Sequence, residues 1–469
     1  MTAPTLRQRM TAADASFLYF ERPTAPLHIG STLVIDGEIS REEVVTHIAS
    51  RLHRIPRYRQ IAAFDAFNIG HPRWEDDDRF DILRHIEDVR LPDGASMEEI
   101  FAVIANLFAP MLPRDRPLWK MIIIHGLPGG RTGITSLVHH CMVDGVSGME
   151  LLTAITDFEA DAPQDTPQPF NPDPRPDATQ RSIDAYIETV ESNFAQQADQ
   201  LRLFFDRQRQ ESEQRAVFGA MTAALPQMTR PAPATPFNRP VGGKRSYAVV
   251  PMSFAEIRGV RSTIGGTIND VVLTTLSGGV GAYLRAHGHA TEGVELRGMV
   301  PVNVRSESDK SALGNQVSMF IAPLPVGIVD PAERHLAVVN GMNRLKEANQ
   351  AGGFAVMARA ADQVPAFVQA MTGPLVPNAP SMLNMICTNV PGPQIPLYFV
   401  GRKAEALWPL VPISMGMGLN VALTSYNGML FWGICADPEL VPDVGRVAEY
   451  VQAAFDDLKA VAAATVATG

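Results

Sequence analysis

The sequence predicts a globular α/β protein of two domains, and three observations lead to this expectation. The chain has 469 residues, which is too long for a single hydrophobic core. Its composition, 46% hydrophobic and 19% charged, is typical of a folded protein. A segment rich in Pro and Asp at 161–176 separates two halves that each contain strand and helix patterns. We therefore expect domains at 1–165 and 246–469, joined by a Pro-rich linker with a polar helix at 166–245.

The first half alternates between strand and helix patterns. A helix at 97–111 is well defined, because Ile100, Ile104, Leu107 and Phe108 share one helical face. The other expected elements are strands at 27–35, 120–125 and 134–138, and helices at 41–52 and 145–158. A Gly-Gly turn separates the second and third strands, so these two should form a pair that leads into the motif described below.

The second half follows a polar helix expected at 182–215. Its clearest feature is Asn427-Gly428, a turn typical of a hairpin between strands at 419–426 and 429–435. Further strands are expected at 246–250, 298–304, 317–322 and 385–389. Further helices are expected at 253–263, 271–285, 332–349 and 441–459.

Two adjacent histidines, His139 and His140, stand at the end of the strand expected at 134–138. Asp144 occupies the position of a helix N-cap, and Gly145 permits a tight turn into the next helix. Neighbouring side chains of a strand point to opposite faces, so both histidines can address one substrate only if the strand has ended. We expect one of them to be the working base.

The charge and cysteine content exclude several classes of protein. A net charge of −10 argues against a nucleic-acid partner and against electrostatic binding to anionic lipid. The sequence contains no apolar segment long enough for a transmembrane helix and no signal peptide at its start, which predicts a cytoplasmic protein. The three cysteines are expected to be buried, reduced thiols.

Short blocks along the whole chain except the linker resemble the bacterial wax ester synthase/diacylglycerol acyltransferase family, in the same order. The histidine motif matches the HHxxxDG signature of CoA-dependent acyltransferases. The other blocks are 14–21 with 27–30, 56–60, 80–81 with His85, 116–119, 269–271, 301–305, 389–393 and 418–420. Leu137 and Cys141 depart from the family, which commonly has a Lys and an Ala at these positions. The departure at Leu137 removes any contact that the Lys would make, but it leaves the histidine chemistry unchanged.

The resemblance implies a fold of two subdomains similar to chloramphenicol acetyltransferase, each a mixed sheet flanked by helices, with the active site in a channel at their interface. It also implies transfer of a long-chain acyl group from acyl-CoA to diacylglycerol or a long-chain alcohol, giving triacylglycerol or wax ester. The second histidine, here His140, would be the general base. His139 is expected to be structural and hydrogen-bonded to backbone. Contact with a membrane or a lipid inclusion fits such acceptors.

The candidate catalytic set is His140, His139, Asp144 and Asn269, with Gly145 and Arg305 as structural support. Asn269 could donate its amide to the oxyanion that forms on the thioester, although an Asn before an apolar helix is also an ordinary cap. The resemblance implies that Asp144 pairs with Arg305 and does not act as a relay to His140. Loss of either partner should then lower stability and activity together.

Four alternatives accompany this hypothesis. His139, His140 and Asp144 offer three metal ligands, but adjacent histidines at a strand end diverge, so we expect no metal and no organic cofactor. Cys141 could form an acyl-enzyme, although direct transfer fits the family better. The acyl donor could instead be held by a carrier protein, as in condensation-type acyltransferases. A non-catalytic lipid-binding protein is the remaining possibility.

Overall fold

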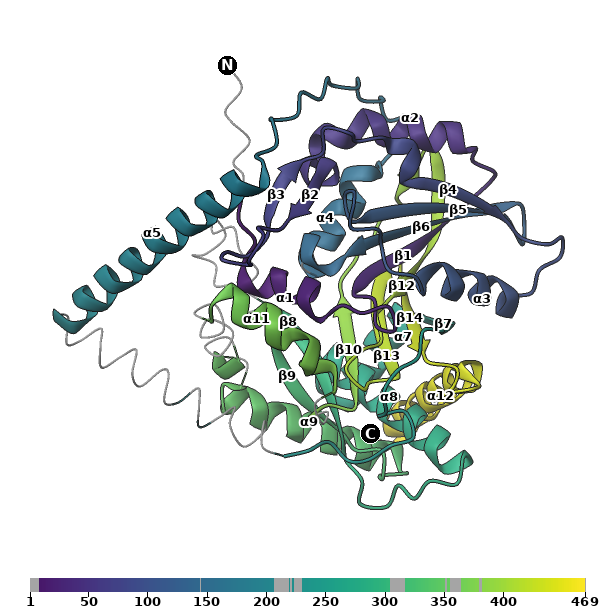
Figure 1. Cartoon of the computed structure of the whole chain (residues 1–469). Coiled ribbons are helices and arrows are strands. Elements are labelled where there is room, and N and C mark those ends of the chain that lie inside the picture. Colours follow the sequence, from purple (N-terminus) through teal and green to yellow (C-terminus); the bar gives the residue numbers. More distant parts are fainter. Residues whose placement is uncertain are drawn as a thin grey trace.

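The computed structural model describes residues 8–143, 145–205, 230–303, 317–350, 352–354, 364–378 and 382–468, together with Gly219 and Thr222. Two six-stranded sheets form the centre of the two lobes, and helices flank them (Figure 1). Both sheets contain parallel and antiparallel pairs. The predicted fold class, mixed sheets flanked by helices in two subdomains, is confirmed.

The first sheet has the strand order β11-β12-β1-β6-β5-β4. Its strands are β1 (His28–Ile35), β4 (Ile86–Arg90), β5 (Trp119–Leu127), β6 (Arg131–His139), β11 (Tyr398–Phe399) and β12 (Arg402–Leu410). The helices of this lobe are α1 (Ala12–Phe20), α2 (Arg41–Arg51), α3 (Met97–Phe108) and α4 (Gly145–Ile155). Buried Ile, Leu and Val side chains of β1, β5 and β6 pack with those of α2 and α3 in one core. A small sheet of β2 (Gln60–Ala63) and β3 (Arg73–Asp76) lies beside it.

The second sheet has the order β7-β14-β13-β10-β8-β9. Its strands are β7 (Ser246–Ser253), β8 (Leu296–Asn303), β9 (Val317–Leu324), β10 (Met385–Val390), β13 (Leu419–Tyr426) and β14 (Met429–Ala436). It is covered by α7 (Phe254–Ile264), α8 (Ile268–Ala286), α9 (Pro331–Glu347) and α12 (Val444–Thr468). Fourteen of the 19 residues of α8 are buried, so this helix lies within the core of the second lobe. The predicted hairpin around Asn427-Gly428 is confirmed.

The two sheets pack on each other where β12 crosses β14. The Tyr247 hydroxyl donates to the Pro409 carbonyl at 2.8 Å, and Gly433 is required opposite Pro409 because any Cβ there would collide with that carbonyl. β12 also pairs with β1, so residues from late in the chain complete the first sheet. The predicted division into 1–165, 166–245 and 246–469 stays a prediction. Two strands of the last range, β11 and β12, belong to the first sheet.

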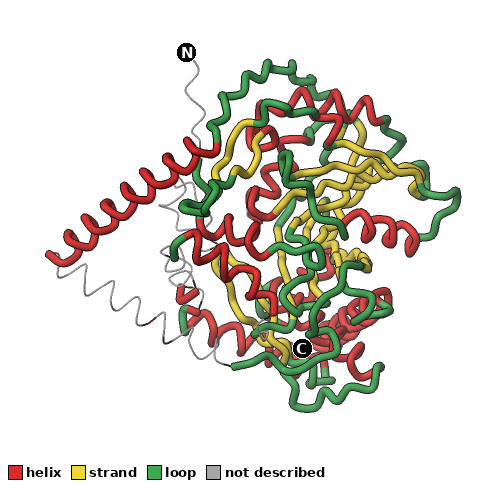
Figure 2. The backbone as a smooth tube through the Cα atoms, in the orientation of Figure 1, coloured by secondary structure: helices red, strands yellow, loops and turns green. Residues whose placement is uncertain are grey.

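The linker leads into α5 (Ala178–Phe205), which extends away from the body of the molecule (Figure 2). Arg181 of this helix makes a bidentate pair with Glu75 at 2.8 Å, and Arg175 of the linker pairs with Asp77. These contacts fasten the start of α5 to the β2–β3 sheet. The helix expected at 182–215 is confirmed as far as Phe205, and 206–215 lie outside the described residues.

Candidate active site

The histidine motif is placed by the end of β6. His139 is the last residue of the strand, where it pairs with His28 of β1, and His140 begins the 3-10 turn η4 (His140–Met142). The backbone N–H of His140 donates to the Leu27 carbonyl at 2.9 Å. The strand therefore ends between the two histidines, so strand alternation no longer determines where the second side chain lies. Their surroundings distinguish the two.

His139 is fully buried, and a polar atom lies near each of its ring nitrogens. Nδ1 accepts a hydrogen bond from the backbone N–H of Cys141 at 3.2 Å, which requires a lone pair there and assigns the ring proton to Nε2. Nε2 lies 3.3 Å from Oε1 of Glu21, an electrostatic contact that does not have the geometry of a hydrogen bond. The expected backbone hydrogen bond of His139 is thus confirmed, and this ring holds the turn that carries His140.

Glu21 connects the motif to the first helix. One carboxylate oxygen accepts from the Leu27 N–H at 3.0 Å, and the other accepts from Arg114 at 2.9 Å. Burial by itself would raise the pKa of Glu21, but the contacts with His139, the Leu27 N–H and Arg114 outweigh it and lower the pKa to about 2. Glu21 is therefore ionised at neutral pH although its side chain has no exposed surface.

His140 has a different environment, because it is only partly buried. Its ring stacks on the ring of Phe17 from α1, with centroids 3.9 Å apart and planes inclined by 12°. Stacking of this kind fixes the face of the imidazole, while its two nitrogens stay at the ring edge, where polar contacts are made. The stacking on Phe17 therefore holds the His140 imidazole in one orientation, at the first residue after β6.

Cys141 is 3% exposed and follows the two histidines directly. Burial, reinforced by the negative charges of Asp14 and Glu21, raises the pKa of this thiol well above its ordinary value. A nucleophilic cysteine has to ionise, and here ionisation is disfavoured. Burial of the thiol and its raised pKa therefore favour a packed thiol over the acyl-enzyme alternative.

Asn269 lies in the first turn of α8, but it does not cap the helix. The cap is Thr267, whose hydroxyl accepts from the Asp270 N–H at 3.2 Å while the Asp270 carboxylate accepts from the Thr267 N–H at 2.8 Å. Oδ1 of Asn269 accepts a long hydrogen bond of 3.4 Å from Asn389 of β10, which joins two of the sequence blocks. Among the described contacts none links Asn269 with His140, so its oxyanion role stays a prediction.

Asp144 and Arg305 lie outside the described residues, and the bridge expected between them stays a prediction. Gly145 is the first residue of α4, where the tight turn was expected. Sequence reasoning missed Phe17, Glu21 and Arg114 as parts of the site. The signal for the first two was their place in the 14–21 block.

Within the part of the chain that the structure describes, no group of three His, Cys, Asp or Glu side chains is arranged to hold a metal ion. Within the same part of the chain, each helix is too short or too polar to cross a bilayer.

His28, opposite His139 on β1, should make stability depend on pH. It is fully buried, and Nε2 lies 2.8 Å from the Phe108 carbonyl. Burial lowers the pKa of His28 to about 4, compared with about 6.5 when unfolded. The unfolded chain therefore binds more protons between these values, and stability should fall by about 2 kcal/mol from pH 7 to pH 5 on account of this residue. Urea unfolding of wild type and His28→Gln at both pH values measures it, and an unchanged pH dependence in the variant would contradict the assignment.

Comparison with known proteins gives consistent matches over nearly the whole chain. Residues 10–272 match the wax ester synthase/diacylglycerol acyltransferase catalytic domain, and residues 313–459 match the C-terminal domain of the same family. The probable diacylglycerol O-acyltransferase tgs1 of Mycobacterium tuberculosis is 30% identical over 466 residues, which cover 96% of each chain.

Solved structures show the same fold. The wax ester synthase/diacylglycerol acyltransferase from Marinobacter aquaeolei VT8 is similar with a TM-score of 0.67 at 23% identity, over 97% of this chain and 100% of that one. The first condensation domain of the calcium-dependent antibiotic synthetase is similar with a TM-score of 0.59 at 16% identity, over 96% of this chain and 97% of that domain.

Proposed function

Because the chain belongs to the wax ester synthase/diacylglycerol acyltransferase family, we propose that it moves a long-chain acyl group from acyl-CoA to the hydroxyl of diacylglycerol or a long-chain alcohol, with His140 as general base. The product would be triacylglycerol or a wax ester. The observation that carries the assignment of the base is the contrast between the two histidines. His139 is fully buried, with Nδ1 accepting from the Cys141 N–H and Nε2 facing the Glu21 carboxylate, whereas His140 is only partly buried and its ring stacks on Phe17.

The proposed reaction uses only groups of the protein and its substrates. A neutral His140 nitrogen takes the proton of the acceptor hydroxyl while that oxygen attacks the thioester carbonyl. The tetrahedral intermediate places negative charge on the former carbonyl oxygen, for which the Asn269 amide is the proposed donor. Collapse of the intermediate breaks the C–S bond, and the proton held by His140 passes to the departing CoA thiolate. The ester and free CoA are the products, and no metal or organic cofactor is required.

The test is release of free CoA from palmitoyl-CoA in the presence of hexadecanol or dioleoylglycerol. His140→Ala should lower kcat by about 10²–10⁴-fold, the range typical of a lost general base. His289→Ala is the matched control, because His289 is an exposed histidine and its substitution should leave the rate unchanged. Full activity of His140→Ala would refute the assignment of the base.

The same assay separates the other candidate functions. Turnover only when the acyl group is supplied on a carrier protein would favour a condensation-type reaction. The similarity to condensation domains, at 16% identity, concerns the fold alone. Lipid binding without turnover of any donor would favour a non-catalytic protein. Turnover of palmitoyl-CoA by the wild type excludes a non-catalytic protein. Turnover without a carrier protein excludes a condensation-type reaction that requires one.

A further inference from the structure

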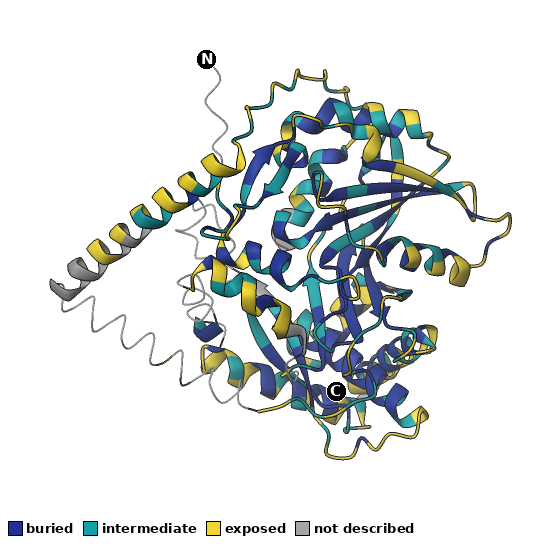
Figure 3. Cartoon of the chain, in the orientation of Figure 1, coloured by how far each residue is buried: buried dark blue, intermediate teal, exposed yellow. Residues whose placement is uncertain are grey.

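The helix α11 (Ala366–Thr372) and the 3-10 turn η6 (Gly373–Asn378) that follows it expose their large apolar side chains. Phe367, Met371 and Leu375 are 49%, 74% and 67% exposed and recur every four residues. We call these three residues the apolar ridge. Figure 3 shows the exposed positions along this helix, whose place in the fold is labelled in Figure 1. A surface helix normally turns its large apolar residues inward, so this orientation is reversed.

Small residues make the contact of this segment with the body. Ala366 and Gly373 are buried, and Ala370 packs against the core of the first lobe. A Cβ at position 373 would lie 2.8 Å from Cβ of Tyr19, so the segment rests closely on α1. The ridge residues are therefore not needed to attach the segment to the body.

Composition restricts what the ridge can bind. The segment 364–378 contains no charged residue, so it offers no ion pair to a charged protein surface or to anionic headgroups. Side chains without charge can enter the acyl region of a lipid layer without the cost of burying an ion. A neutral lipid surface suits this composition.

The ridge is also next to the site. α11 and η6 both pack on α1, the helix that carries Phe17 against the His140 ring. A lipid surface at the ridge would be separated from the proposed base by this one helix. The acceptors in the proposed function are insoluble in water and reside in such a surface.

We propose that the apolar ridge Phe367, Met371 and Leu375 docks the protein on a neutral lipid surface, from which the acyl acceptor enters. This inference rests on the proposed function for the identity of the acceptor. The binding itself is apolar, so it does not depend on anionic lipid and persists at high salt.

Flotation of the full chain with phosphatidylcholine vesicles containing dioleoylglycerol tests the binding directly. Met371→Ser and Phe367→Ser should each weaken partition into vesicles by about tenfold, the effect of losing one buried apolar side chain. Leu336→Ser on α9 is the matched control, since Leu336 is 60% exposed but lies outside the ridge. Urea unfolding should be unchanged in all three variants, because each side chain is exposed.

Kinetics distinguish a failure of this inference from a failure of the proposed function. Met371→Ser should retain wild-type turnover of palmitoyl-CoA with the water-soluble acceptor hexanol, and its turnover with vesicle-borne dioleoylglycerol should fall by up to about tenfold, in line with the weaker partition. Wild-type protein that turns over hexanol but does not float with vesicles would overturn the inference alone. Binding that requires anionic lipid would overturn it as well, as would a wild-type dimer that Met371→Ser converts to a monomer. Absence of turnover with every acceptor would instead refute the proposed function.

Discussion

Replacing Glu21 with glutamine should lower both the stability and the activity of this acyltransferase. The carboxylate accepts from Leu27 N–H and Arg114, and it faces Nε2 of His139. A glutamine of the same shape presents one oxygen and one NH₂, so at least one of these donors loses its acceptor. Each buried donor left without an acceptor costs about 1–3 kcal/mol. The midpoint of urea unfolding should therefore fall clearly.

Activity should fall for a reason separate from stability. His139 holds the turn that begins at His140 by accepting from the Cys141 N–H, which it can do only while its proton is on Nε2. The Glu21 carboxylate favours that tautomer. Glu21→Gln removes this preference, so kcat should drop even at temperatures where the variant remains folded.

The sign of the pH effect follows from the lowered pKa of Glu21. The folded value is about 2, below the ordinary value of 4.5, because the contacts with His139, the Leu27 N–H and Arg114 outweigh the opposing effect of burial. The stabilisation is present in full above the ordinary value and is lost as the pH falls toward 2. Glu405→Gln on β12 is the control, because the Glu405–Arg131 pair at 3.3 Å is exposed and should contribute about 0–1 kcal/mol. Equal stability and activity of Glu21→Gln and wild type would refute the role of this carboxylate.

The sequence predicted the elements around the motif because their patterns are local. β6, η4 and the start of α4 follow from an apolar strand, two histidines and a glycine in succession. That the strand ends between His139 and His140 became evident only in the structure, because the alternation of side chains along a strand does not show at which residue the strand stops.

β12 illustrates what sequence patterns could not predict. Its residues include Arg402, Lys403 and Glu405, and Pro409 lies near its end, features that argue against a central strand. Pairing with β1 and packing under β14 outweigh those preferences. Such tertiary contacts join residues far apart in the chain, so no short window contains them.

Asn269 and Glu21 are two further residues whose roles could not be predicted from the sequence alone. The sequence is compatible with Asn269 as a helix cap and as an oxyanion donor, because an asparagine side chain can serve in either role. The structure assigns the cap to Thr267 and Asp270 and thereby removes that explanation for Asn269. Glu21 was within a recognised block, but its partners Arg114 and His139 are distant in sequence and became evident only in the fold.

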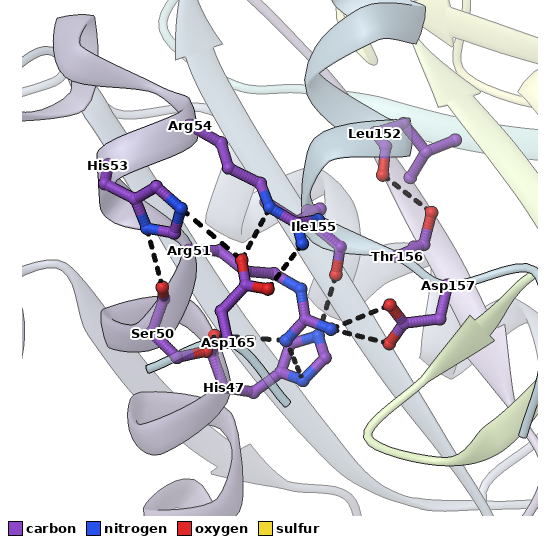
Figure 4. A network of polar contacts seen from close by, with 10 residues as sticks. All are labelled: His47, Ser50, Arg51, His53, Arg54, Leu152, Ile155, Thr156, Asp157 and Asp165. Atoms are coloured by element: carbon purple, nitrogen blue, oxygen red, sulfur yellow. Dashed lines mark hydrogen bonds and ion pairs between the residues drawn. The ribbon is translucent and has the colours of Figure 1, made fainter. Parts of the chain in front are cut away.

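Replacing Arg51 with methionine should cause the largest loss of stability without a comparable loss of catalysis. Arg51 is 1% exposed at its side chain, and its guanidinium donates to both carboxylate oxygens of Asp157 at 2.7 Å (Figure 4). It also donates to Nδ1 of His47 at 2.7 Å, while Nε2 of His47 donates to the Ile155 carbonyl at 2.8 Å. The network fastens α2 to the end of α4.

Asp157 makes this network a connection between distant parts of the chain. Its backbone N–H and carbonyl both pair with Tyr398 of β11 at 2.8 Å, so the late strand and the first lobe meet at this residue. Removing Arg51 leaves the Asp157 carboxylate and His47 Nδ1 without their donor in a largely buried place. Breaking a buried pair in this way costs about 3–5 kcal/mol.

A double-mutant cycle measures the effect of Arg51. Arg51→Met should shift the urea midpoint strongly, and the combination with Asp157→Asn should recover part of the loss, because the second change removes the uncompensated charge. Arg54→Met is the control, since Arg54 pairs with Asp165 at 2.6 Å but is 38% exposed, and its loss should cost at most about 1 kcal/mol. The network lies at the C-terminal end of α4, and none of its described contacts is with Phe17 or the His140 ring. The kcat of folded Arg51→Met should therefore stay near that of the wild type. Equal midpoints for Arg51→Met and Arg54→Met would refute the predicted difference between buried and exposed pairs.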